Sequence, residues 1–454
     1  MAEHDPSVTD GASATDASKL KTLLSILKRT VGVKDLASLR ISLPAYMMEP
    51  IPNLEYWNYQ DRADFFVTVG DYEDPMDRML AMVRYAVTKE LKFVHGKVVK
   101  PYNSILGEHF RCHWDVEPLR TDASGGFVPH QSVGNTKPPT HLELVTKQPQ
   151  DHDGCKKRVV YVTEQVSHHP PVSFYYYACP DAGLEMTGVD QLSAKFTGTA
   201  MRIFSGEKNQ GVFVKLTYGV RAKSAVGEEY HLTHPAGAIF GLFRGSFWPA
   251  VTDTATITCT PAPSANGAKP VYLRALLEYV EEGWLSKPKY AVEGVVYAYE
   301  PDHASASYTS VRKVPSDRVL VYIQGNWRGL LTWRYKDEKT THPLIDLADL
   351  EPCERKVRPL EQQDELESRR IWSGVTKAIL EKEYSRATNV KIDLEQQQRD
   401  QAKARAEAGT NFVPRYFEDG IENGKPKLTA AGKAAVLDEL RRDNSKDMPL
   451  PTKN

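Results

Sequence analysis

The sequence predicts an α+β protein dominated by a large antiparallel β-sheet that closes into a barrel, with helical segments before and after it. From about residue 107 to 329 the chain consists of short runs rich in Val, Tyr, Phe and Thr. Gly, Pro and Asn separate these runs at short spacing, which is typical of antiparallel strands. Upstream, apolar residues recur with a helical period, and from residue 361 onward the chain is highly charged with a helical pattern.

Composition and charge limit the class of protein. The 454 residues carry a net charge of −1, with 41% hydrophobic and 26% charged residues, as in a soluble globular protein without a nucleic-acid partner. The five cysteines are scattered, which argues against disulfides or a structural zinc site, and no apolar run reaches the roughly 18 residues that span a bilayer. We therefore expect a cytoplasmic protein without a metal or cofactor.

The N-terminal segment predicts a tail followed by an amphipathic helix. Residues 1–17 are small and polar, and we expect them to be disordered. In the region 18–37 one helical stripe, flanked by basic residues, is formed by Leu20, Leu23, Leu24, Leu27 and Val31. Such a helix either docks permanently on the core or acts as a lid whose apolar face exchanges between protein and lipid. The two interpretations are compatible, since a lid docks when closed.

The remaining elements follow in order. Residues 38–106 are expected to be mostly helical, including a helix at about 74–91 in which Asp74 is the N-cap and Pro75 the first residue. The β core is expected at 107–350, with surface insertions at 121–139 and 261–270, then a helical C-terminal subdomain at 351–420 and a polar tail at 421–454. Strands are predicted at 159–163, 172–177, 211–217, 238–247, 254–260, 290–299 and 319–324.

The most informative motif is Glu164-Gln165-Val166-Ser167-His168-His169-Pro170-Pro171. It lies between two predicted strands, and its prolines disfavour helix in the preceding residues, so both imidazoles are expected on a locally rigid loop. Loops of this kind often contact ligands. The alternative is a turn with two half-exposed histidines, which on the surface needs no functional explanation.

Two further segments carry candidate residues. One is Lys100-Pro101-Tyr102-Asn103-Ser104-Ile105-Leu106-Gly107-Glu108. The other is a helical segment in which Lys391, Glu395 and Arg399 are spaced i, i+4 and i+8 and therefore share one face. On its own this spacing is equally typical of a solvated row of salt bridges.

Together the three segments resemble the oxysterol-binding protein family of lipid-transfer proteins, in a short fungal-type form with the lipid-binding domain alone. The resemblance extends over about 39–417, and the chain departs from it at Ser104, where the family usually has proline. It implies that the headgroup of phosphatidylinositol 4-phosphate is bound by Lys100, Asn103, His168, His169, Lys391, Glu395 and Arg399. In this arrangement the cations and protonated imidazoles contact phosphate, Asn103 adds neutral hydrogen bonds, and Glu395 orients its cationic neighbours or accepts inositol hydroxyls.

The resemblance also implies a single tunnel under the N-terminal lid, which holds either the phosphoinositide or a second lipid. The lid would include Leu23, Leu24 and Leu27, and Leu43, Met47 and Met48 are candidate tunnel-lining residues, although ordinary core packing explains them equally well. The second lipid is phosphatidylserine or a sterol, with family-like segments such as 74–79 favouring phosphatidylserine slightly. We expect a monomer that touches membranes transiently, between the endoplasmic reticulum and the Golgi or plasma membrane.

Two other functional classes are alternatives to lipid transfer. A hydrolase acting on phosphoinositides would use His168 or His169 as a base, but the chain has no Gly-x-Ser-x-Gly elbow and no phosphate-binding Gly-rich loop. His231 and His234 lack a Cys or carboxylate partner at ligand spacing and are expected at a strand end. A non-transferring lipid sensor or scaffold is the remaining alternative. The segment 64–66 is a poor match to a two-phenylalanine docking motif.

Overall fold

A computed structural model of the chain describes residues 48–89, 91–94, 101–119, 156–197, 200–240, 248–262, 270–281 and 290–443, without the side chain of Trp248. The predicted tail (1–17), lid helix (18–37) and insertion (121–139) lie outside these ranges, as does all but the edges of the insertion at 261–270. Lys100, Leu43 and Met47 also lie outside the described residues.

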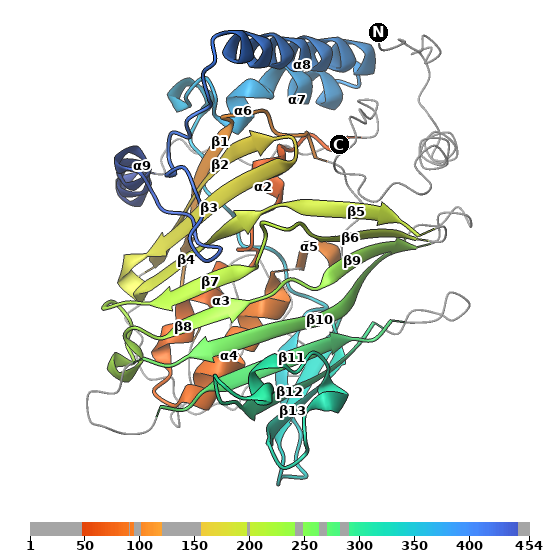
Figure 1. Cartoon of the computed structure of the whole chain (residues 1–454), viewed down its shortest axis with the longest axis vertical. Helices are drawn as coiled ribbons and strands as arrows, with labels where there is room; N and C mark the ends of the chain where they lie inside the picture. Colours follow the sequence, from red (N-terminus) through yellow and green to blue (C-terminus); the bar gives the residue numbers. More distant parts are fainter. Residues whose placement is uncertain are drawn as a thin grey trace.

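Fifteen strands form one antiparallel sheet in the described part of the chain, which confirms the predicted fold class (Figure 1). Hydrogen-bonded neighbours follow the order β1-β2-β3-β4-β7-β8-β10-β11-β12-β13-β14-β15, while β5, β6 and β9 branch from β10. Within the described residues no ladder joins β1 to β15, so hydrogen bonds do not close the sheet there. The strands are β1 (His109–Val116), β2 (Lys157–His168), β3 (Pro171–Cys179), β4 (Leu184–Asp190), β5 (Leu192–Phe196), β6 (Met201–Ser205), β7 (Val212–Leu216), β8 (Glu229–Leu232), β9 (Ala236–Phe240), β10 (Trp248–Thr260), β11 (Leu273–Tyr279), β12 (Ala291–Ala298), β13 (Val319–Asn326), β14 (Leu330–Tyr335) and β15 (His342–Asp346).

The β2–β3 hairpin shows why this sequence forms strands. Successive side chains of a strand point to opposite faces of the sheet, and here both faces are covered. Val160, Val162 and Phe174 belong to one apolar cluster, whereas Tyr161 and Tyr175 belong to the main core on the other face. Aromatic and β-branched residues suit such a doubly buried position, so the strand signal in the sequence was strong.

Short helices precede the sheet and pack against it. They are α2 (Asn53–Tyr56), α3 (Ala63–Thr68), α4 (Pro75–Thr88) and α5 (Leu91–Val94). Helix α4 begins as predicted, because the Asp74 side chain accepts hydrogen bonds from the Met76 and Asp77 amides and Pro75 occupies the first turn. Its buried face contacts β10, β11 and β15 (Figure 1). Asp64 and Phe66 are buried on α3, so this segment is part of the core.

The C-terminal part forms a helical layer beside the β1–β3 end of the sheet (Figure 1). It comprises α6 (Ser368–Ile371), α7 (Ser373–Leu380), α8 (Tyr384–Glu407) and α9 (Ala430–Arg441). The expectation of a polar tail from residue 421 was wrong for the described residues up to 443, since they contain α9. This helix packs on β1 and β2 and buries Ala435, Val436 and Glu439. None of the helices in the described ranges combines the length and apolar character needed to traverse a bilayer.

Candidate functional site

The two adjacent histidines lie at the tip of the β2–β3 hairpin. His168 is the last residue of β2 and is half-buried, and His169 is exposed in the turn that leads to Pro171, the first residue of β3. Their ring centroids are 4.5 Å apart. The Nδ1 atom of His168 lies 3.1 Å from the carbonyl oxygen of Ser104. The hairpin tip is therefore attached to the loop that carries Asn103, which is exposed.

The backbone between residues 102 and 108 is held against the same hairpin. The Gly107 amide donates to the Gln165 carbonyl at 2.9 Å, and the Gln165 amide donates to the Glu108 carbonyl at 2.8 Å. Gly107 has φ 81°, and a Cβ there would lie 3.2 Å from Phe412. Glycine is suited to this position because it adopts positive φ without steric cost. The Asn103 loop is thus joined to the histidine motif by backbone and side chain together.

Glu108 connects this loop to the C-terminal helices. Its fully buried carboxylate accepts hydrogen bonds from the Ile105 amide at 2.9 Å, the Ser368 hydroxyl at 2.7 Å and the Trp372 indole at 3.1 Å. Burial raises the pKa of Glu108 to about 7, and these hydrogen bonds only partly offset the effect. The carboxylate is therefore a polar junction between the loop, α6 and the residue that precedes α7.

An apolar cluster extends this junction toward α8. Tyr102 stacks on Trp372 with ring centroids 4.8 Å apart, and its hydroxyl lies 3.1 Å from the Thr376 hydroxyl. Ile105 belongs to the same cluster, as does Met48, which is buried here among core residues. This placement agrees with the core alternative for Met48. From α8, the cluster takes in Ala387, with Val390 and Leu394 packed against it.

The three charged residues of α8 differ in their environments. The side chain of Lys391 is only 8% exposed, and its Nζ pairs with the Glu395 carboxylate at 2.9 Å. Glu395 is 32% exposed. Arg399 is exposed and donates through Nε to Gln396 at 3.1 Å, so the structure does not bring it into the Lys391–Glu395 pair. A buried ammonium is well suited to bind an anion, because further negative charge would stabilise it.

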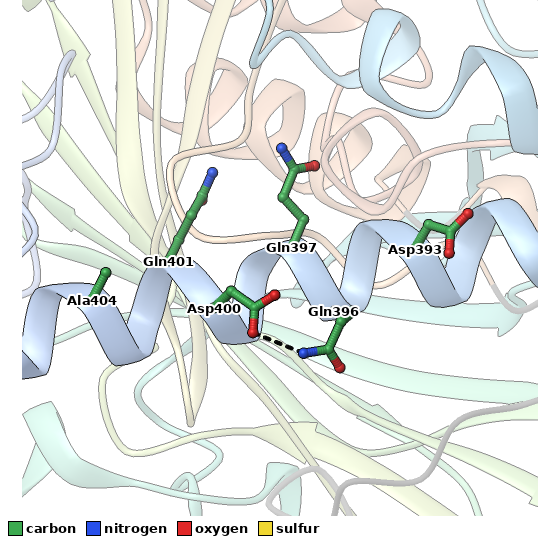
Figure 2. Close-up of a pocket in the computed structure, with 6 residues that line it drawn as sticks. All are labelled: Asp393, Gln396, Gln397, Asp400, Gln401 and Ala404. Atoms are coloured by element: carbon green, nitrogen blue, oxygen red, sulfur yellow. Dashed lines mark hydrogen bonds between the residues drawn. The ribbon is translucent and has the colours of Figure 1, made fainter.

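A groove of ≈ 560 Å³ lies on another face of α8. Figure 2 shows the residues that line it, and Gln396 donates to Asp400 across it at 2.8 Å. Its lining consists of carboxylates, amides and one methyl group, without a cation, so it does not suit a phosphate. The lining residues are Asp393, Gln396, Gln397, Asp400, Gln401 and Ala404.

The predicted site residues therefore fall into two described groups. His168 and His169 meet the Asn103 loop at the hairpin tip, and Lys391 pairs with Glu395 on α8. The segment 102–105 links them, because Tyr102 and Ile105 pack in a cluster that Val390 and Leu394 join from α8, one residue before and three residues after Lys391. Lys100, Leu23, Leu24, Leu27, Leu43 and Met47 lie outside the described residues. His231 and His234 lie at a strand end, as predicted, since His231 is in β8 and His234 follows the last residue of that strand.

Comparison with known proteins decides the family. The sequence model described as "Oxysterol-binding protein" matches residues 22–378. The chain belongs to the oxysterol-binding protein family. This membership confirms the resemblance on which the site residues were predicted. It also confirms the expectation of a lipid-binding protein rather than an enzyme.

Relatives from fungi and from animals share most of the chain. The Schizosaccharomyces pombe protein "Oxysterol-binding protein-like protein 1" is 35% identical over 93% of this chain and 91% of its own length. The human "Oxysterol-binding protein-related protein 11" is 30% identical over 90% of this chain but only 49% of its own length. The oxysterol-binding chain described here thus spans about half of the human relative.

Solved structures of the family share the fold. The Osh1 ORD domain in complex with ergosterol superposes with a TM-score of 0.61 at 18% identity, covering 97% of this chain and 92% of that domain. The Saccharomyces cerevisiae Osh3 ORD in complex with PI(4)P gives 0.59 at 17% identity, covering 93% and 94%. At these identities the likeness establishes the architecture of the oxysterol-binding domain, independently of any ligand.

Sequence reasoning missed the residues that support the candidate site. Ser104 was noted only as a departure from proline, whereas its carbonyl holds His168. The sequence predicted no role for Glu108, which ends a family-like segment, or for Trp372. Their contact joins positions 264 residues apart, so no local pattern could have revealed it. The available signal was the position of Glu108 directly before β1, because a carboxylate that is buried at the start of a strand requires partners.

Proposed function

We propose that this chain is a lipid-exchange protein that binds one lipid at a time and extracts phosphatidylinositol 4-phosphate from membranes. In this proposal the phosphoinositide headgroup is bound by Lys100, Asn103, His168, His169, Lys391, Glu395 and Arg399. The observation that carries the proposal is the connection of His168, through the 102–105 segment, to the apolar cluster that borders the buried Lys391.

The chemistry of this arrangement suits an inositol phosphate. Lys391 provides a positive charge in a mostly desolvated position, where charge-assisted hydrogen bonds are stronger than in water. The imidazoles add donors on the exposed side, and Asn103 adds an amide. Glu395 holds Lys391 when no headgroup is present, so the ammonium keeps a partner in the empty state.

The second lipid completes the exchange. We propose that it is phosphatidylserine or a sterol, held with its apolar part in the interior of the β core and covered by the helix at 18–37. Each methylene removed from water contributes about 0.8 kcal/mol, so either lipid gains enough from burial to compete for one site. A related domain has been solved with ergosterol and another with PI(4)P, which supports both occupants.

The proposed cellular role follows from exchange. A monomeric, cytoplasmic carrier would contact membranes transiently and move the second lipid outward from the endoplasmic reticulum as phosphatidylinositol 4-phosphate returns from the Golgi or plasma membrane. The proposed division of the chain assigns lipid enclosure to 18–37 and 107–350, and headgroup binding to 100–106 together with 351–420.

The test is transfer between two liposome populations, with labelled phosphatidylinositol 4-phosphate in one and phosphatidylserine or ergosterol in the other. We expect stoichiometric extraction of unreacted phosphoinositide and faster transfer of it when the second lipid is present in the opposite liposomes. Binding without movement between liposomes would instead indicate a sensor, and conversion of the label to a new product would indicate a hydrolase. Mass spectrometry of lipids that co-purify with the protein identifies the second lipid.

A further inference from the structure

A second cluster of polar side chains lies where β1 begins. The His109 amide donates to the Leu366 carbonyl at 3.0 Å, and His109 forms an isolated parallel bridge with Glu367. This backbone contact brings the start of β1 beside the segment that precedes α6, although the two are more than 250 residues apart in sequence. The side chains of His109, Asp364 and Glu367 meet there.

Two buried atoms of this cluster are left without hydrogen bonds. The His109 side chain is 1% exposed, and its Nε2 has no hydrogen-bond partner within the described residues. The same holds for Oε1 of Glu367, whose side chain is also 1% exposed. Buried polar atoms in proteins are nearly always hydrogen-bonded or bound to water or an ion. Two such atoms in one cluster point to a missing partner that accepts lone pairs from both.

The geometry of the cluster matches a metal ion. Ligand atoms of the three residues all lie within 4.8 Å of one another, and His109 Nε2 is 3.6 Å from Asp364 Oδ2. Ligands about 2.0–2.2 Å from a tetrahedral ion are about 3.3–3.6 Å apart, so small side-chain movements would suffice. Nδ1 of His109 lies 3.3 Å from the Gly107 carbonyl, which can only accept. The proton is therefore on Nδ1, and the lone pair of Nε2 faces the carboxylates, as in metal-bound histidines.

We propose that His109, Asp364 and Glu367 form a binding site for a divalent transition-metal ion of the Zn²⁺ type, with a fourth position for water. An imidazole nitrogen with two carboxylate oxygens is a donor set that Zn²⁺ accepts. The sequence predicted no metal site, because these ligands have no recognisable spacing along the chain. A bound ion would fasten the start of β1 to α6, next to Glu108 and the loop that supports His168.

Three arginines next to the carboxylates affect how tightly the cluster is expected to bind Zn²⁺. Arg415 Nη1 lies 2.9 Å from Asp364 Oδ2, and Arg111 Nη2 and Arg358 Nε lie 3.5 Å and 3.7 Å from Glu367 oxygens. Such donors orient ligating carboxylates, but their positive charge opposes a cation. Zn²⁺ should therefore bind more weakly than at a thiolate site. Arg415 is 55% exposed, so replacing it should remove opposing charge while disturbing the interior little.

The test is titration of the full, chelator-treated chain with Zn²⁺ by calorimetry and with Co²⁺ by visible absorption at fixed pH. For wild type we expect one saturable site. His109→Ala should weaken binding at least about 10-fold, and Arg415→Gln should strengthen it several-fold. The matched control is His342→Ala, because the His342 side chain is 43% exposed and its Nε2 lies 3.4 Å from Glu338, a His–Glu pair outside the cluster. This control should bind the ion like wild type.

Five outcomes decide the proposal. It is overturned if wild type shows no saturable site, or if His109→Ala and His342→Ala bind equally well. It is also overturned if the signal disappears only when His168 and His169 are both replaced, which would assign the ion to the hairpin tip. If His109→Ala does not fold, Asp364→Asn serves the same comparison, because Asp364 is 40% exposed. Loss of the site in that variant supports the proposal, and unchanged binding overturns it.

Discussion

The imidazole of His168 donates through Nδ1 to the carbonyl oxygen of Ser104 at 3.1 Å, because a carbonyl can only accept. This contact determines how the ring can act on a ligand. A ring that already donates through Nδ1 donates through Nε2 as well only when it is protonated to imidazolium. An arriving phosphate favours that form. With Nδ1 donating to Ser104, Nε2 accepts from a hydroxyl when the ring is neutral and donates to a phosphate once the ring is protonated.

Lys391 provides the first prediction. Lys391→Gln removes a buried charge and its ion pair with Glu395, and we expect phosphoinositide extraction to weaken at least about 10-fold, the value of one charge-assisted hydrogen bond. Transfer of the second lipid should be retained. The matched control on the same helix is Lys403→Gln, because Lys403 pairs with Glu407 at 3.7 Å but is 76% exposed. Equal losses in both variants, measured by liposome extraction, would contradict the assignment.

Arg399 is expected to matter less than Lys391. It is exposed and bound to Gln396, and it lies eight residues, about 12 Å, farther along the helix axis. Arg399→Gln should therefore reduce phosphoinositide extraction only a few-fold in the same liposome assay. This reduction should become smaller as salt is added, because salt screens an exposed charge, whereas the reduction caused by Lys391→Gln should change little with salt. An effect as large as that of Lys391→Gln would show that the headgroup extends along α8.

Glu108 predicts a pH dependence of stability. Its pKa is about 7 in the folded chain, raised by burial from an ordinary value of 4.5. Between these two values the folded state binds the proton more tightly, so stability falls as pH rises through this window, by roughly 3 kcal/mol in total. Glu108→Gln should remove this fall.

The measurement is urea unfolding at several pH values, with tryptophan fluorescence as the signal, since the Trp372 indole donates to Glu108. The difference between wild type and variant isolates Glu108 from other titrating groups such as His113, whose pKa is also raised. Glu354→Gln is the control, because Glu354 is 69% exposed in its pair with Lys356. A pH-independent difference between Glu108→Gln and wild type would contradict the prediction.

The pair between Glu55 and Arg369 predicts a large stability effect. Arg369 contacts both carboxylate oxygens of Glu55, at 2.7 Å and 2.8 Å, and joins α2 to α6. Arg369→Met leaves the fully buried Glu55 carboxylate with Arg355 alone, and we expect a loss of about 3–5 kcal/mol in unfolding free energy. Arg386→Met breaks an exposed pair between α8 and its N-cap residue Glu383 and should lower the unfolding free energy far less, because solvent screens exposed ion pairs. Similar midpoints in chemical denaturation would refute this difference.

Local signals predicted the fold better than the site. Asp74 and Pro75 identified the start of α4, and the Val and Tyr runs identified β2 and β3, because capping and alternation depend on neighbouring residues. A polar tail was predicted where α9 lies, and the docking of this helix depends on distant ion pairs. Its buried Glu439 binds Arg358 and His113, the latter at 2.7 Å, and these partners hold the pKa of Glu439 at about 2 despite its burial.

In the candidate site, too, local motifs could be predicted from the sequence and contacts between distant residues could not. The histidine motif and the α8 spacing were visible in the sequence, but not the elements that join them. Tyr102 reaches Trp372 and Thr376 across about 270 residues of chain, and such contacts follow from tertiary packing alone. The cluster at His109, Asp364 and Glu367 was invisible for the same reason.

The most direct measurement is phosphoinositide extraction from liposomes by a variant in which both His168 and His169 are replaced by Ala, alongside uptake of the second lipid by the same protein. Because the pair is assigned to the headgroup and not to the apolar interior, extraction of phosphatidylinositol 4-phosphate should be abolished while uptake of the second lipid stays close to wild type. Equal loss of both activities in a folded variant, or unchanged phosphoinositide extraction, would contradict the proposed headgroup site.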